Sequence, residues 1–371
     1  MLDIDPAALG ETAEQAELRA VLRDFFAATS SPDDVRKHLA TPRGFDETLW
    51  SRLAGEIGVP GLAIPAEFGG AGFSFAELAV AIGEAGRALA CTPLLSTTVL
   101  AGHALLLSGD QVACRRYLPA LAAGTRTATV AGFESGGLTA GPGAGGWAGS
   151  GQADFVLDGA GADVVVLAAS TGSGPGLFAC EAGAPGLTRQ PRAVLDGTRP
   201  QALVTLRETP LTPIGAPSEA AGVVARVLDI GRAALAVEQV GGSAHALEAT
   251  IAYVGQRHQF GRPVGSFQAV QHRLADLLVE VEAARSAAAY AVACVDGAPA
   301  ELAVAAGVAQ VVCSETYRRA AEEYVQLHGG IGFTWEHPAH LYLRRARSAE
   351  VLFGTADDHR RRLAGLLGLT T

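Results

Sequence analysis

The chain has 371 residues, a formal net charge of −10 at pH 7, and a composition that is 49% hydrophobic and 18% charged. A chain of this length is able to bury a large core, and we expect two or three packed units rather than one. The acidic balance argues against nucleic acid or an anionic membrane as the main partner, because both favour a basic surface. We expect no signal peptide and no membrane span, since no basic segment precedes an apolar run at the N-terminus and no apolar stretch reaches about 18 residues.

The cysteines and histidines indicate neither disulfides nor a metal site. The cysteines are odd in number and none is spaced as C-x-x-C, so we expect buried thiols in a reducing, cytoplasmic compartment. The nine histidines show no H-E-x-x-H spacing and no pairing with cysteine, and no metal is therefore predicted. The cysteines are Cys91, Cys114, Cys180, Cys294 and Cys313.

Helical periodicity dominates from about residue 12 to residue 125. In "AELAVAIGEAGRAL", for example, Leu78, Ile82 and Ala85 fall along one helical face. This part of the chain predicts an N-terminal α-helical domain over residues 1–125.

The apolar pattern changes from helix-like to strand-like between about residues 127 and 215. The short runs "TATVAGF", "DFVLDG", "ADVVVLAA" and "QALVTL" favour strands. They alternate with the Gly- and Pro-rich stretches "SGGLTAGPGAGG" and "STGSGPG", which we interpret as turns. A middle β domain is predicted over residues 126–215.

Helical periodicity returns at Ser218, which follows Pro217 and is a predicted N-cap. The pattern continues almost to the end and predicts a C-terminal helical domain over residues 216–371, so the chain is of the α+β multidomain class. A helix with an apolar stripe needs a partner surface, either within the chain or across a subunit boundary. One such stripe consists of Leu274, Leu277, Leu278 and Val281.

The segment "GQRHQFGRPVGSFQAVQHRLAD" predicts a helix end, a loop and a new helix start. Arg257 and Gln268 are then able to point at one object, and an arginine beside a helix N-terminus suits a phosphate group. The alternative is an ordinary turn between helices with a surface arginine.

The segment "EYVQLHGGIGF" combines Gln326 and His328 with three glycines that allow a close approach of the backbone. The alternatives are a C-terminal helix cap at Gly329 and Gly330 and a packed histidine at position 328. No strand-linked G-x-G-x-x-G is present, so any dinucleotide must be held without a Rossmann unit.

Three stretches, in order and over nearly the whole chain, resemble the acyl-CoA dehydrogenase family. They are "IGVPGLAIPAEFGGAGFSFAELAVAIGEAGRAL", "RHQFGRPVGSFQAVQHRLAD" and "QLHGGIGFTWEHPAHLYLRRA". The resemblance implies a β-barrel-like middle domain between two helical domains, the second a four-helix bundle, and assembly as a tetramer.

The resemblance also implies FAD as the cofactor, an acyl-CoA thioester as the substrate and an electron-transfer flavoprotein as the electron acceptor. A glutamate of the family removes the α-proton while the β-hydrogen leaves as hydride to the flavin. Arg232 corresponds to a family arginine near that base. The positions that correspond to FAD contacts are Arg257, Gln259, Phe260 and Gln268, reaching a neighbouring subunit, and Gln326, His328, Gly329, Gly330, Thr355 and Asp357.

The chain departs from the family where chemistry is expected. Phe353 stands where many members carry the glutamate base, and Gly231 occupies the second position used for it. The family's aromatic-Ile-Thr beside the flavin ring is Phe155-Val156-Leu157 here, without the hydroxyl. The carboxylates left as candidate bases are Glu238, Glu350 and Asp357.

These departures favour the base-lacking subunit of a heteromer, of the kind that some bacterial members form with a related subunit. Such heteromers are associated with steroid or other bulky acyl-CoA substrates. The alternatives are an assembly subunit without turnover, and an oxidase or monooxygenase on the same fold.

Overall fold

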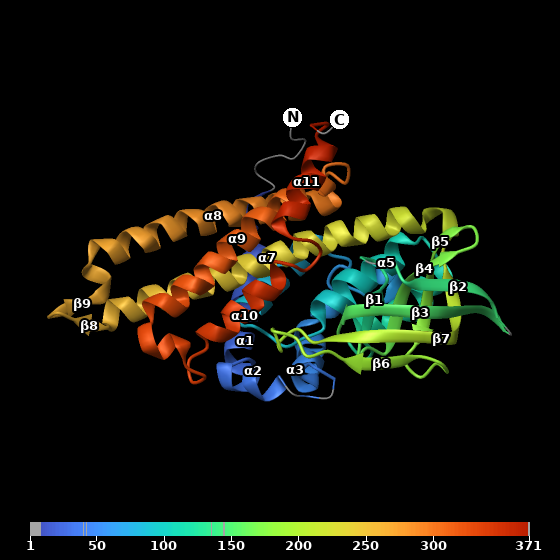
Figure 1. Ribbon diagram of the computed structural model, residues 1–371, viewed down its shortest axis with the longest axis horizontal. Helices are drawn as coiled ribbons and strands as arrows, with labels where there is room; N and C mark the ends of the chain where they lie inside the picture. Colours follow the sequence, from blue (N-terminus) through green and yellow to red (C-terminus); the bar gives the residue numbers. More distant parts are fainter. Residues whose placement is uncertain (1–8, 40, 42, 135, 144, 370–371) are drawn as a thin grey trace. The chain divides into compact units, whose positions relative to one another are not determined.

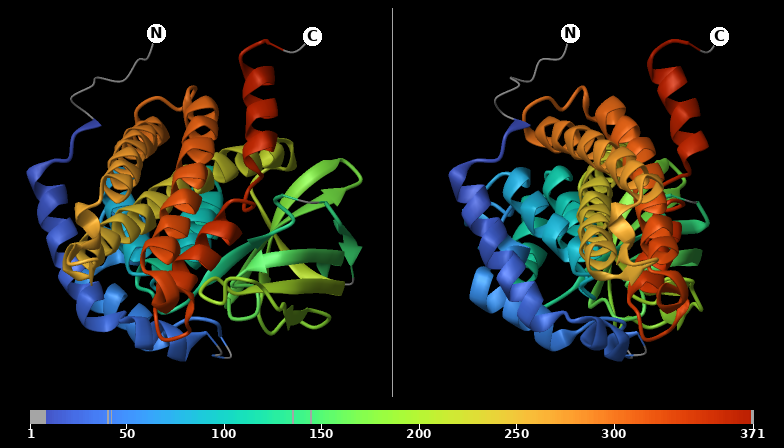
Figure 2. Two further views of the ribbon diagram at one scale, coloured as in Figure 1. Left: turned by 60° about the vertical axis from the view of Figure 1, so that its left-hand side comes forward. Right: turned by 90° about the vertical axis from the view of Figure 1, so that its left-hand side faces the viewer.

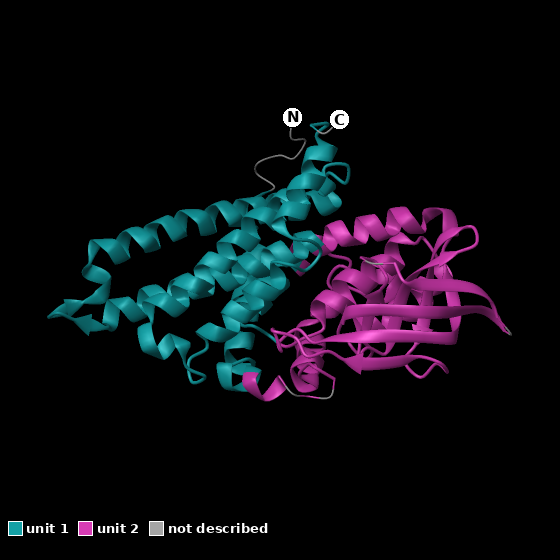
Figure 3. Cartoon of the chain, in the orientation of Figure 1, with its two compact units in different colours: residues 1–35, 79–90, 232–371 teal, residues 36–78, 91–231 magenta. Residues whose placement is uncertain are grey.

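The computed structural model describes residues 9–39, 41, 43–134, 136–143 and 145–369. The chain divides into two compact units (Figure 3). We call Met1–Val35, Ala79–Ala90 and Arg232–Thr371 the helical unit, and Arg36–Leu78 with Cys91–Gly231 the mixed unit. The order along the chain is helical, β-stranded and helical, which confirms the predicted fold class, while the boundaries at 125 and 215 stay predictions.

Helices make up most of both ends of the chain (Figures 1 and 2). The α-helices are α1 (Ala13–Thr29), α2 (Pro32–His38), α3 (Glu47–Arg52), α4 (Phe75–Arg87), α5 (Gly102–Leu107), α6 (Gln111–Ala122), α7 (Ala220–Gln256), α8 (Gln268–Asp296), α9 (Leu302–Leu327), α10 (Ala339–Ala349) and α11 (Ala356–Leu366). No helix in the described residues is long and apolar enough to cross a membrane.

The C-terminal bundle forms from α7, α8, α9 and α10. Gly242 allows α7 to approach α9 closely, since a Cβ at this position would lie 2.5 Å from the Tyr317 ring. Gln239 of α7 donates through its Nε2 atom to the Ser314 hydroxyl of α9 at 2.9 Å, which links two buried polar side chains of these helices. On α8, Leu277 and Val281 are buried as the stripe predicts, whereas Leu278 stays 48% exposed.

The strands are β1 (Ala128–Ala131), β2 (Leu138–Gly143), β3 (Gly146–Leu157), β4 (Val164–Thr171), β5 (Gly174–Glu181), β6 (Thr188–Pro191), β7 (Gln201–Ile214), β8 (His258–Gln259) and β9 (Arg262–Pro263). Pairing runs β4–β2–β3–β7–β5 and returns from β5 to β4, so the sheet closes on itself as a barrel. Apolar side chains such as Val165, Leu167 and Phe178 fill its interior.

The sequence predicts a turn over "SGGLTAGPGAGG", and this prediction is wrong for most of its described residues, because they form β2 and the start of β3. The glycines of this stretch fit a crowded barrel: a Cβ on Gly143 would lie 2.7 Å from the Ala148 Cβ. Similarly, α7 begins at Ala220 after a 3₁₀ turn over Pro217–Glu219, so Ser218 is not its N-cap.

All five cysteines are free and buried, as the sequence predicts. Burial raises the pKa of the Cys114 and Cys180 thiols to about 11. At neutral pH these groups therefore stay protonated and behave as small apolar side chains.

Candidate functional site

The Phe353-Gly354 turn after α10 is held by Arg232 of α7. The Nε and Nη2 atoms of Arg232 each donate to the Phe353 carbonyl oxygen at 3.2 Å. Phe353 has a φ of +62° and is 5% exposed, so a bulky residue occupies a backbone conformation that favours glycine. Two donors from one guanidinium thus fix a strained, buried turn.

His359 lies beneath this turn and was not anticipated from the sequence. Its ring is 2% exposed, and within the described residues its Nε2 atom has no hydrogen-bond partner. A Cβ built on Gly354 would lie 3.4 Å from that nitrogen. Burial, with repulsion from Arg232 and Arg362, lowers the pKa of His359 to about 4, so the imidazole is neutral at pH 7.

Arg232→Ala tests how strongly the turn is held. We expect the free energy of unfolding to fall by about 1–3 kcal/mol, because the buried Phe353 carbonyl loses its charged donors. Arg232→Lys should recover part of the loss, since an ammonium group retains a donor but not the planar fork. Urea unfolding of the three proteins measures both effects, and equal stability of all three would show that the contact contributes nothing.

The candidate carboxylates are all engaged with arginines. Glu238 pairs with Arg345 at 2.8 Å, Glu350 with Arg347 at 3.1 Å and Asp357 with Arg360 at 3.0 Å. The Glu238 pair is buried, whereas the Asp357 side chain is 83% exposed. Each carboxylate therefore has a structural partner that explains its presence.

The predicted loop after α7 is a short hairpin, β8–β9, at one end of the helical unit (Figures 1 and 2). The Val264 amide donates to the Arg257 carbonyl at 2.7 Å, which closes the hairpin. Arg257, Gln259 and Phe260 are exposed, with Phe260 at 92% and at a φ of +53°. Within the described residues the Arg257 guanidinium makes no hydrogen bond or ion pair, so it is available to an external anion.

Gln268 is the first residue of α8, and its side chain is exposed. The preceding N-cap residue, Phe267, provides no side-chain hydrogen bond to the first turn. The Val270 and Gln271 amides both donate to the Phe267 carbonyl, so within the described residues the Gln268 and Ala269 amides are the ones left for an outside acceptor such as a phosphate.

The Gln326–Gly330 turn ends α9 and enters a 3₁₀ turn over Gly329–Phe333. Gly329 has a φ of +61°, and a Cβ at Gly329 or Gly330 would meet nothing within 4 Å. Gly330 is therefore not required by packing within the chain. Its open backbone leaves room for a ligand or another subunit to approach.

His328 takes the packing role that the sequence left open. Its ring is 5% exposed and stacks on Tyr253 of α7, with ring centroids 4.1 Å apart. Its Nδ1 atom lies 2.8 Å from the Tyr324 carbonyl oxygen. The side chain does not face the surface, so any ligand contact of this residue would be made by its backbone.

Burial lowers the pKa of His328 to about 4, with a smaller contribution from His337. Burial also lowers the pKa of His359 to about 4. The folded pKa lies below the ordinary value of 6.5, so the unfolded state binds more protons between these limits. Stability is then full above pH 6.5 and is lost as the pH falls towards 4. Denaturant unfolding across this range should show a shallower loss for His328→Phe, and an unchanged slope would contradict the assignment.

The structure brings some of the predicted residues together and separates others. The Tyr253–His328 stack joins the Gln326–Gly330 turn to the end of α7, four residues before Arg257. Thr355 instead caps α11, where its hydroxyl accepts from the Asp358 amide and donates to that carboxylate at 2.6 Å. Helix α11 lies well away from the hairpin within one chain (Figures 1 and 2).

Two family descriptions match the chain. The acyl-CoA dehydrogenase N-terminal domain matches residues 12–125, and the acyl-CoA dehydrogenase C-terminal domain matches residues 221–367. The acyl-CoA dehydrogenase IpdE2 of Mycobacterium tuberculosis is 37% identical over 357 residues, which cover 94% of this chain and 96% of that protein. The chain belongs to the acyl-CoA dehydrogenase family. It is thus an oxidoreductase of the type that acts on CH–CH donors.

Two solved structures are similar to the chain over almost its whole length. A variant of the Tcur3481–Tcur3483 steroid ACAD has a TM-score of 0.86 at 34% identity, covering 96% of this chain and 98% of that chain. The ChsE4–ChsE5 complex of Mycobacterium tuberculosis has a TM-score of 0.88 at 28% identity, covering 99% and 100%.

The segment Phe155-Val156-Leu157, which we expect to depart from the family motif beside the flavin, lies in β3 of the barrel. Phe155 sits at a β-bulge against β7, has a φ of +55° and is 61% exposed. Leu157 is buried, and its carbonyl accepts from the Thr129 hydroxyl. At this position the acyl-CoA dehydrogenase presents an exposed aromatic ring and a core leucine.

Proposed function

We propose that this acyl-CoA dehydrogenase is one subunit of a FAD-dependent heteromer, completing a flavin site together with a related subunit that carries the catalytic base. The observation that carries the proposal is the Phe353 turn. A buried phenylalanine occupies the expected base position, and Arg232 holds its carbonyl. Each candidate replacement carboxylate is already paired with arginine.

The residues that would contact the ADP part of FAD fit that group. Arg257 offers an unengaged guanidinium, α8 offers its first amides beside Gln268, and Gly329 and Gly330 leave space for a close approach. The residues expected beside the flavin ring do not supply a donor, because Leu157 is buried and apolar. The chain thus offers contacts to the ADP part of FAD but none to the reacting flavin ring, which supports the proposal that another subunit supplies the contacts to the ring.

Assembly across a subunit boundary is supported by the distribution of apolar side chains on the helical unit. Phe260 of the hairpin is 92% exposed, and Phe333 of the 3₁₀ turn over Gly329–Phe333 is 88% exposed. On α8, Leu278 and Val279 are 48% and 69% exposed. Leu278 and Val279 are neighbours on α8, and exposed apolar groups that adjoin one another mark interaction surfaces. Helix α11 and the hairpin lie apart within one chain (Figures 1 and 2), which supports contacts to one FAD from different subunits.

In this proposal the two subunits divide the chemistry. When bound, FAD supplies the acceptor for the hydride that leaves the β-carbon of the acyl-CoA. The partner subunit would supply the base for the α-proton, and an electron-transfer flavoprotein would be the final electron acceptor. This chain contributes Arg257 as counter-charge for the pyrophosphate, while Phe353 keeps water out of its own turn.

The substrate of the heteromer is proposed to be a bulky acyl-CoA, such as one with a steroid-derived acyl group. The steroid ACAD that is 34% identical supports this class of substrate. A small residue at the second base position, Gly231, also leaves the α7 segment without a side chain there.

Co-expression with a related chain that has the glutamate tests the proposal. We expect a stable complex of the two unlike chains that retains one FAD per pair, and little FAD on this chain purified alone. Native mass spectrometry and flavin absorbance measure both quantities. A homo-oligomer of this chain with one FAD per protomer would contradict the proposal, and a flavin-free complex would indicate an assembly subunit instead.

A further inference from the structure

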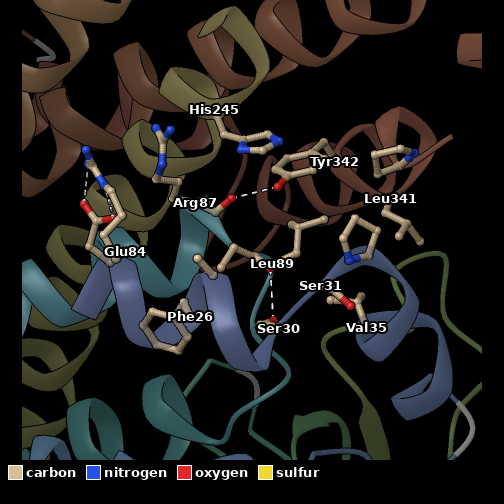
Figure 4. Close-up of a pocket in the computed structure, with 15 residues that line it drawn as sticks. Phe26, Ser30, Ser31, Val35, Glu84, Arg87, Leu89, His245, Leu341 and Tyr342 are labelled. Carbon is tan, nitrogen blue, oxygen red and sulfur yellow. Dashed lines mark hydrogen bonds and ion pairs between the residues drawn. The ribbon is translucent and has the colours of Figure 1, made fainter. Parts of the chain in front are cut away.

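A pocket of about 350 Å³ lies within the helical unit, between α1, α4, α7 and α10 (Figure 4). Its volume falls in the roughly 300–1,000 Å³ range of small-molecule sites. The walls are mainly apolar, with Phe26, Leu89 and Leu341 among them. Two of the lining residues, Ala27 and Pro32, are exposed.

Most polar groups that line the pocket are already satisfied. Glu84 accepts from Arg23 at 2.9 Å, and Arg87 forms an ion pair with Glu248. The Tyr342 hydroxyl donates to the Arg87 carbonyl at 2.7 Å. The arginine charges are therefore neutralised, and the pocket offers no free cation to an anionic ligand.

His245 differs from these groups. Its imidazole stacks on the Tyr342 ring with centroids 4.6 Å apart and planes 3° apart, facing the pocket (Figure 4). Within the described residues neither ring nitrogen makes a hydrogen bond. Burial, with Arg87 next in effect, lowers the pKa of His245 to about 4, so the ring is neutral and has one donor and one acceptor.

We propose that this pocket binds an uncharged, compact apolar molecule with a single hydroxyl group, which His245 recognises by hydrogen bonding. A hydroxyl matches a neutral imidazole because each group both donates and accepts. The apolar body gains by leaving water for walls such as Phe26 and Leu341. An anionic ligand is disfavoured because Arg23 and Arg87 are paired with carboxylates.

The test uses 2-naphthol as the probe and 2-methylnaphthalene as its isostere without a hydroxyl, with binding to the full chain followed by probe fluorescence. We expect saturable binding of both. His245→Phe, which keeps a ring beside Tyr342, should weaken 2-naphthol binding roughly 2- to 12-fold and leave the isostere unaffected. His272→Phe, on the exposed face of α8, is the matched control and should change neither affinity.

Ala27→Trp, which adds a large side chain at an exposed lining position, should weaken binding of both probes strongly and provides a second test if His245→Phe folds poorly. No saturable binding of 2-naphthol to the wild-type chain would overturn the proposal. Equal 2-naphthol affinity of wild type and His245→Phe would also overturn it, and would leave His245 as a packing ring only.

Discussion

Replacing Glu238 with alanine should lower the free energy of unfolding by about 3–5 kcal/mol. Glu238 and Arg345 form a buried ion pair at 2.8 Å between α7 and α10. Removing the carboxylate leaves the Arg345 charge buried without this partner, which costs far more than losing a surface pair. Chemical denaturation followed by circular dichroism measures the change.

Glu350→Ala is the matched control, because Glu350 also pairs with an arginine but both partners are partly exposed. It should cost no more than about 1 kcal/mol. The comparison also tests the catalytic alternative for Glu238. A Glu238→Ala protein with full stability and lost turnover would make this residue a base and contradict its structural role.

Arg257→Ala should weaken FAD retention by the heteromer about 10- to 150-fold, the effect of losing charge-assisted hydrogen bonds to a phosphate. The stability of the isolated chain should hardly change, since the guanidinium is exposed and makes no ion pair in the described residues. Flavin content after dialysis, together with FAD titration of the apoprotein, measures the loss.

Arg262→Ala provides the control on the same hairpin. The Arg262 guanidinium lies 3.9 Å from the Phe267 ring centre, so it already has a cation–π partner within the chain. Its removal should reduce FAD retention much less than that of Arg257. Equal losses in the two variants would indicate a general effect of hairpin charge rather than a specific contact.

The fold was largely predictable because its signals are local. Apolar residues at helical spacing, such as Leu277 and Val281, mark buried helix faces. The order of helical and strand-like sequence patterns along the chain gives the order of the helical and β segments. Leu278 is an exception to the buried helix face. Its spacing fits the buried stripe, yet 48% of it stays exposed, because spacing alone does not state whether the partner surface lies in the same chain.

The Gly-rich strand β2 was missed for a physical reason. Glycine usually marks turns, but in a closed barrel it also marks places where another strand leaves no room for a side chain. At Gly151 a Cβ would lie 1.9 Å from the Gly137 carbonyl oxygen. Such crowding comes from the pairing of distant segments and leaves no local pattern.

The candidate site was only partly visible in the sequence. The sequence shows directly that position 353 carries no carboxylate. It does not show the hydrogen bonds from Arg232 to the Phe353 carbonyl, because these depend on how α7 packs against the turn. His359 has no motif around it, and only folding places it beneath Gly354. The role of His328 was left open between ligand contact and packing, and the stack on Tyr253 shows the packing.

Anaerobic reduction of the flavin by an acyl-CoA tests the central claim most directly. A bulky acyl-CoA is added to the FAD-loaded complex with a base-bearing partner and, for comparison, to the same complex whose partner carries glutamine in place of the glutamate and to this chain supplied with an equal amount of FAD, and flavin absorbance is followed. We expect bleaching only by the complex with the glutamate, because Phe353 cannot accept the α-proton. Full bleaching by the chain alone, at the rate of the complex, would contradict this claim.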